Sequence, residues 1–100
     1  MSRRIKIKVD ANQAGIVAGL RKAGYAVQTL EQGGGVPDLL ISDRATGQTR
    51  LIEVKMPGGK LTPAQRIWID DWPGAVHVVM SADEALDVVA ADRHRCRGRA

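Results

Sequence analysis

The stretch VPDLLISDRATGQTRLIEVK, residues 36–55, contains two largely apolar runs joined by a short polar segment. Residues 36–42 and 48–55 each have the length and the branched aliphatic side chains of a β-strand. Residues 43–47 between them have the composition of a hairpin turn. The stretch therefore predicts a β-hairpin, and residues 25–30 predict a further strand before it.

Helical patterns are found on both sides of these strands. Asp10 is expected to cap a first helix, with Gln13 in the reciprocal position, and this helix is expected to end at Gly24. The alternating residues 5–9 before it predict an edge strand or an extended lead-in. Ser81, with Glu84 three residues later, is expected to cap the last helix.

A further helix is predicted between the hairpin and the last strand. Thr62 is its expected N-cap, Pro63 lies in its first turn, and Gln65 would close a capping box. This helix is expected to end at residues 72–74, and residues 75–80 read as a fourth strand. The predicted order is α-β-β-β-α-β-α, an α/β fold with a mixed β-sheet of about four strands flanked by helices.

The composition fits one domain, which we place at residues 1–92, followed by a basic tail at residues 93–100. The chain has 100 residues, 44% of them hydrophobic, which is enough for one aliphatic core and too few for two. No apolar stretch is long enough to span a bilayer, and the start lacks the apolar region of a secretory signal. Cys96 is the only cysteine, which fits a reducing cytoplasm.

Positive charge is concentrated at both ends of a chain whose formal net charge is +4. Such ends can neutralise phosphates, although a solubilising terminus has the same composition. The candidate phosphate contacts are Lys60 and, near the start, Arg3, Arg4 and Lys6. Charge therefore suggests a polyanionic partner without identifying it.

Three side chains of the hairpin form the candidate chemical site. The strand period of two places Glu53 and Lys55 on one face, with Ile52 and Val54 turned to the core. In the predicted hairpin, Asp38 lies near Glu53 at the far end of the partner strand. Two carboxylates can hold Mg²⁺, which polarises phosphate and activates water, while a lysine offsets the charge that develops on the phosphorane.

This pattern resembles the PD-(D/E)xK nuclease superfamily, and most closely its small VRR-NUC-like, phage-type branch. The resemblance is carried by residues 35–38 (GVPD), 52–55 (IEVK) and 61–65 (LTPAQ), and more weakly by the first helix. It implies a restriction-endonuclease-like core, DNA as the substrate and a divalent metal, Mg²⁺ with Mn²⁺ as a substitute. Junction-resolving and flap-processing activities are known in such families.

The resemblance also implies roles for individual residues. Asp38, Glu53 and Val54 would hold the metal, Lys55 would be the catalytic lysine, and Gln65 would line the site. Many relatives carry a glutamate on the first helix that points to the metal, and this chain has none there. Asp10 and Gln13 are the available substitutes, and the sequence does not choose between them.

Each of these residues also has a structural interpretation. Asp38 could simply begin a strand, and Gln65 could serve only the capping box. Glu53 and Lys55 could form a solvated strand face. Trp68 and Trp72 are expected to be core anchors rather than base-stacking platforms.

The sequence thus predicts a Mg²⁺-dependent DNA endonuclease acting on branched or flapped DNA, in recombination or repair. The alternative is a catalytically silent DNA-binding module that keeps the nuclease fold. A homodimer is expected because a chain this short is a narrow platform for branched DNA. No membrane partner and no small-molecule cofactor are expected, and the predicted location is the cytoplasm of a bacterial or phage-infected cell.

Overall fold

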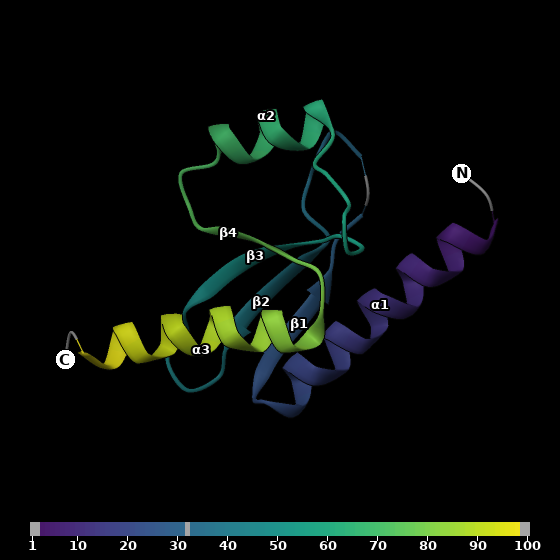
Figure 1. Cartoon of the computed structure of the whole chain (residues 1–100). Coiled ribbons are helices and arrows are strands. Elements are labelled where there is room, and N and C mark those ends of the chain that lie inside the picture. Colours follow the sequence, from purple (N-terminus) through teal and green to yellow (C-terminus); the bar gives the residue numbers. More distant parts are fainter. Residues whose placement is uncertain (1–2, 32, 99–100) are drawn as a thin grey trace.

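The computed structural model describes the main chain of residues 3–31 and 33–98 and the side chains of residues 9–31 and 33–92. Within these residues the elements follow the predicted order α-β-β-β-α-β-α (Figure 1). The helices are α1 (Arg3–Lys22), α2 (Pro63–Asp71) and α3 (Ala82–Gly98), and the strands are β1 (Tyr25–Thr29), β2 (Leu39–Asp43), β3 (Thr49–Val54) and β4 (Val76–Val79). None of these helices, in the part of the chain described, is long and apolar enough to cross a membrane.

The strands form a mixed sheet in the order β1-β2-β3-β4. β2 pairs with β1 and with β3 in antiparallel fashion, whereas β3 and β4 are parallel. The predicted hairpin turn joins β2 to β3: the Asp43 N–H donates to the Gln48 carbonyl over 2.9 Å, and Gly47 adopts a φ of +73°. Parallel strands need a crossover connection, and α2 lies within it. The predicted α/β fold class is confirmed.

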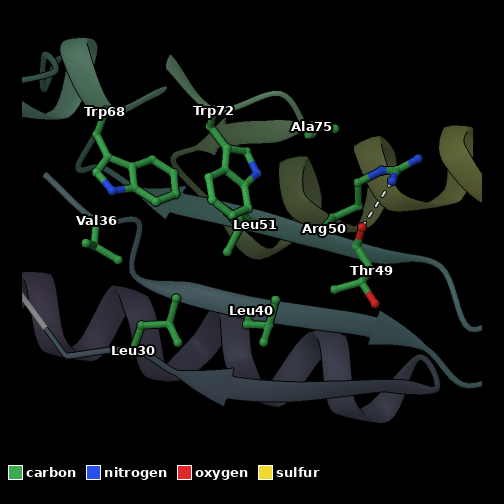
Figure 2. Close-up of a pocket in the computed structure, with 10 residues that line it drawn as sticks. Leu30, Val36, Leu40, Thr49, Arg50, Leu51, Trp68, Trp72 and Ala75 are labelled. Atoms are coloured by element: carbon green, nitrogen blue, oxygen red, sulfur yellow. Dashed lines mark hydrogen bonds between the residues drawn. The ribbon is translucent and has the colours of Figure 1, made fainter. Parts of the chain in front are cut away.

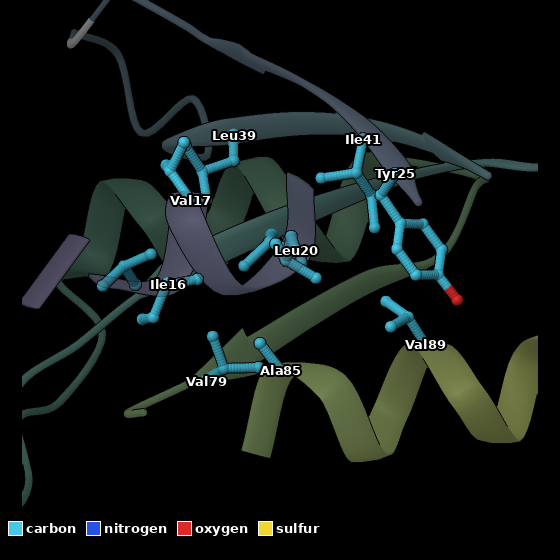
Figure 3. Close-up of a cluster of buried hydrophobic side chains, with 11 residues drawn as sticks. Ile16, Val17, Leu20, Tyr25, Leu39, Ile41, Val79, Ala85 and Val89 are labelled. Atoms are coloured by element: carbon cyan, nitrogen blue, oxygen red, sulfur yellow. The ribbon is translucent and has the colours of Figure 1, made fainter. Parts of the chain in front are cut away.

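The hydrophobic core lies between one face of the sheet and the helices α1 and α3 (Figure 3). Ile16 and Leu20 of α1 are fully buried there, and Ala85 and Val89 contribute from α3. The sheet supplies alternate residues of its strands to the same cluster, namely Tyr25, Leu39, Ile41, Ile52, Val54 and Val79. Since strand side chains alternate, the residues between them point to the opposite face, above which α2 lies.

The predicted signals for the start of the second and third helices and for the end of the first are found at their expected positions. Thr62 and Gln65 form a complete capping box at the start of α2, with Pro63 in its first turn. The Ser81 hydroxyl accepts from the Glu84 N–H over 3.1 Å at the start of α3. α1 ends before Gly24, which has a φ of +98°. The helical main chain of α3 continues past residue 92 to Gly98, into the region predicted as a basic tail.

The predicted start of the first helix is wrong. α1 begins at Arg3 and includes residues 5–9, so Asp10 is an exposed residue within the helix and not its N-cap. The short alternation of isoleucine and lysine is compatible with a strand, but no glycine or proline separates it from the helix that follows. Once a helix is nucleated, each added residue gains a hydrogen bond, and lysine and arginine are good helix formers.

A polar contact joins α3 to the middle of the sheet. The buried carboxylate of Asp92 accepts from Arg50 Nε over 3.1 Å and lies 2.8 Å from His77 Nε2. Burial alone would raise the pKa of Asp92, but the hydrogen bonds and charges of His77 and Arg50 outweigh it, so the pKa is lowered. Ionised Asp92 therefore stabilises the folded state.

We expect Asp92→Asn to lower the free energy of unfolding at pH 7 by about 2 kcal/mol, because charge-assisted hydrogen bonds are lost. Since the pKa is lowered in the folded protein, this stabilisation is present above the ordinary aspartate pKa of about 4 and is lost as the pH falls through the lowered value. Urea unfolding at a series of pH values measures both effects. Asp87→Asn, at an exposed position of α3, is the control. An equal loss of stability at all pH values would contradict this account.

Candidate active site

Asp38 and Glu53 meet on the face of the sheet opposite the core. Leu39 pairs with Ile52, so the preceding Asp38 lies opposite the following Glu53 in the antiparallel register. Both residues are buried, with 7% and 2% of their surfaces exposed. The Asp38 Oδ2 atom accepts from the Val54 N–H over 2.7 Å, which fixes its carboxylate at the end of β3. The predicted approach of these two acids is found in the structure.

The environment of Glu53 favours its neutral form. Burial is the largest cause, and a hydrogen bond to Asp38 and the charge of Asp38 add to it, while Lys55 acts in the opposite direction. Together they raise the pKa of Glu53 from 4.5 to about 8. The Oε1 atom of Glu53 is buried and has no hydrogen-bond partner among the described residues. The charge of Lys55 therefore does not outweigh burial and the charge of Asp38, and the neutral form of Glu53 is favoured.

Lys55 lies next to the acids and is held from α2. Its Nζ atom is 3.6 Å from Glu53 Oε2 and donates to Gln65 Oε1 over 2.6 Å. The same Oε1 atom accepts from the Thr62 N–H over 2.9 Å, and the Gln65 N–H donates back to Thr62 Oγ1 over 3.2 Å. The two interpretations of Gln65 are therefore not exclusive, since one oxygen caps α2 and binds the lysine.

Gly35 sets the distance between the loop that leads to Asp38 and the first turn of α2. A Cβ atom at this position would collide with the Ala64 carbonyl group and would lie 2.9 Å from the Gln65 nitrogen. Its φ of +84° is also a conformation that residues with side chains rarely adopt. Only glycine therefore lets the main chain pass this close to the helix that carries Gln65.

The contribution of the first helix comes from Asn12, which the sequence analysis missed. Its Nδ2 atom donates to the Lys55 carbonyl over 3.3 Å and to the Met80 carbonyl over 3.1 Å. Asn12 thus ties together the chain ends that follow β3 and β4. A signal for it was present, because Asn12 lies four and eight residues before the buried Ile16 and Leu20 and so shares their inward face.

The other predicted residues lie elsewhere or outside the described side chains. Asp10 and Gln13 line a hollow of ≈ 380 Å³ with Thr29 of β1. Thr29 pairs with the core residue Leu39, which places this hollow on the core side of the sheet. Lys60 is exposed in the loop between β3 and α2. The side chains of the predicted DNA contacts Arg3, Arg4 and Lys6 lie outside the described ones.

The donor atoms at the site fit a hard divalent cation. Among the described residues, no group of three or more His, Cys, Asp or Glu side chains could hold a metal. Two carboxylates are nevertheless enough for Mg²⁺, which keeps several waters. The register places the Val54 main chain opposite Pro37, which has no N–H to donate to the Val54 carbonyl. The buried Oε1 atom of Glu53, Asp38 and the Val54 carbonyl are the oxygens available.

In metal-free buffer, we expect Glu53→Gln to raise the free energy of unfolding at pH 8 by on the order of 3 kcal/mol relative to the unmodified chain. The pKa of Glu53 is raised on folding, so its contribution to stability is complete below pH 4.5 and is lost as the pH rises through about 8. The advantage of glutamine should therefore vanish in acid. Urea unfolding with a chelator present measures it, and Glu84→Gln, at an exposed acid, is the control. A difference that does not change with pH would show that burial does not perturb Glu53.

Comparisons with known proteins agree with the fold. A sequence model of the VRR-NUC domain family matches residues 9–79, a span that contains all the site residues described above from Asn12 to Gln65. A solved structure described as a VRR_NUC domain is similar with a TM-score of 0.71 and 25% sequence identity, covering 83% of this chain and 95% of that one. A search of curated proteins finds no match. The chain therefore belongs to the VRR-NUC domain family, a PD-(D/E)xK nuclease-like family, and has its nuclease-type fold.

Proposed function

We propose that this chain is a Mg²⁺-dependent endodeoxyribonuclease that hydrolyses phosphodiester bonds in branched or flapped DNA. The observation that carries the proposal is the buried pair of Asp38 and Glu53, with the unpartnered Oε1 atom of Glu53 and the ammonium group of Lys55 beside it. A purely structural role would leave this pair with an electrostatic cost and no use, since carboxylates are rarely buried unless they are paired.

The proposed metal would be held by Asp38, Glu53 and the Val54 carbonyl. Mg²⁺, or Mn²⁺ in its place, would supply polarisation of the scissile phosphate and a lowered pKa for the attacking water. The residues of the chain perform the remaining tasks. Lys55 places its positive charge where negative charge develops on the phosphate, and Gln65 holds the lysine in place so that little reorganisation is needed.

A DNA-binding module without catalytic activity is the second candidate, and one observation favours it. α1 provides the amide of Asn12 at the edge of the site, whereas its acid, Asp10, lines a hollow on the core side of the sheet. Binding alone, however, requires neither the buried acids nor the ordered lysine. Turnover in the presence of metal distinguishes the two candidates.

We expect the purified chain to cleave a branched or flapped duplex in Mg²⁺ or Mn²⁺, and to be inactive when a chelator is present. Lys55→Met should slow cleavage by about a hundredfold or more while DNA affinity changes little, because the lysine acts mainly on the transition state. Gel assays on branched, flapped and linear DNA measure the rates. Glu53→Gln is the inactive control, and Lys22→Met, at an exposed position in the last turn of α1, is the control for a basic residue outside the carboxylate site. Cleavage no faster than that of Glu53→Gln on every substrate would leave the silent module as the answer.

A homodimer is part of the same proposal. The chain of 100 residues offers a small surface, and a two-fold pair would present two sites to two strands of a branched substrate. Light scattering measures the mass of the chain, free and bound to branched DNA. In at least the bound state, the protein component should have twice the chain mass of 10.8 kDa. A single chain mass in both states would remove the dimer and leave the proposed chemistry intact.

A further inference from the structure

A groove separates α2 from the sheet on the same face that carries Asp38 and Glu53. Its volume is ≈ 460 Å³. The sheet side is formed by aliphatic residues and the helix side by two indoles, as Figure 2 shows: Leu30, Val36, Leu40 and Leu51 lie below Trp68 and Trp72. The proposed hydrolysis does not use this groove, and no residue of the hydrophobic core cluster lines it.

The two tryptophans do not serve as the expected core anchors. α2 contains no buried residue, and Trp72, which follows it, is 46% exposed. The indole rings stack on each other with centroids 4.8 Å apart and an angle of 17° between their planes. Their position over an open groove leaves a large apolar surface available to a ligand, which a core anchor would not do.

The groove continues the candidate active site along the same two strands. Leu40 lies two residues beyond Asp38 in β2, and Leu51 lies two residues before Glu53 in β3, so each pair shares a face. Two residues of a strand span about 7 Å. A phosphate held at the carboxylates would therefore have the base of its own nucleotide, or of the next one, within reach of the indoles.

The far end of the groove is formed by the first residues of β3. Arg50 and Thr49 lie there, at the end away from the carboxylates (Figure 2). Two of the guanidinium donors of Arg50 are used, for Asp92 and for the Thr49 carbonyl. Arg50 shares the core-side face of β3 with Ile52, so its guanidinium group is held by α3 and is not counted as a contact for a ligand in the groove.

We propose that the groove between α2 and the sheet binds an unpaired nucleobase adjacent to the scissile phosphate, in contact with the indoles of Trp68 and Trp72. This inference rests on the proposed action on DNA, and it explains how the substrate would be selected. A paired base would have to leave its stack to enter, whereas a base at a flap or a branch point pays little of that cost. Contact with aromatic rings is tolerant of base identity, so the groove selects an unpaired base rather than a sequence.

Tryptophan fluorescence tests the proposal directly, because the chain has two tryptophans and both line the groove. The probes are a duplex with an unpaired thymine at its flap junction, the same duplex with an abasic nucleotide at that place, and the fully paired duplex, all in metal-free buffer. We expect saturable quenching with the unpaired thymine only. The abasic probe should bind about tenfold more weakly, in line with the loss of one base–aromatic contact.

Variants at Trp72 separate stacking from simple apolar packing. Trp72→Leu should reduce the affinity for the unpaired-thymine probe about tenfold and bring it to that of the abasic probe, while Trp72→Phe should retain most of the difference. Ile67→Ala is the matched control, since Ile67 is 70% exposed on α2 and does not line this groove. Equal affinity for the thymine and abasic probes, or an unchanged preference in Trp72→Leu, would overturn the proposal. A change of fluorescence on dilution without DNA, showing that a second copy covers the groove, would also overturn it.

The outcome is independent of cleavage. The fluorescence assay contains no metal, so it reports binding of the base and not hydrolysis. Quenching without any metal-dependent cleavage would reject the proposed nuclease activity and retain the base pocket. Cleavage without base-dependent quenching would do the reverse.

Discussion

Two carboxyl groups are buried against each other where the chain enters β2 and leaves β3, and the surroundings of this pair have to offset the cost. Asp38 is satisfied by the N–H of Val54 and Lys55 lies beside Glu53, yet one oxygen of Glu53 remains without a partner and its pKa is raised to about 8. Like charges so close cannot both ionise without a counter-charge. In the proposed function a divalent cation would supply this counter-charge, and in its absence protonation of Glu53 relieves the repulsion.

The helix α2 links this pair to the rest of the candidate substrate surface. It has no buried residue, so its position depends on its two ends and not on a packed face. At its start, the capping box and the close passage of Gly35 couple the geometry of the helix to Lys55 through Gln65. Beyond it, the indole of Trp72 covers the groove beside the acids.

The first helix takes part in the site in a different manner from that implied by the family resemblance. Its inward amide, Asn12, binds two main-chain carbonyls and so fixes the ends of the parallel strands β3 and β4. The Lys55 N–H also donates to the Val79 carbonyl over 2.9 Å, so the main chain of the lysine is held from two sides. Glu53 comes from the sheet and Asp38 from the residue before β2, and α1 contributes the amide of Asn12 where the family resemblance implies a further carboxylate.

The sequence by itself determined the features that depend on neighbours along the chain. The hairpin, the strand period and the capping boxes follow from local turn chemistry and side-chain alternation, and they were sufficient to bring Asp38, Glu53 and Lys55 to one face and Gln65 to the start of α2. Only the tertiary structure decided the partners of Asn12, whose contact with Lys55 spans 43 residues. It also decided that Trp72 lies over a groove. Periodicity shows which residues share a face, but what that face meets is set by packing between elements far apart in the sequence.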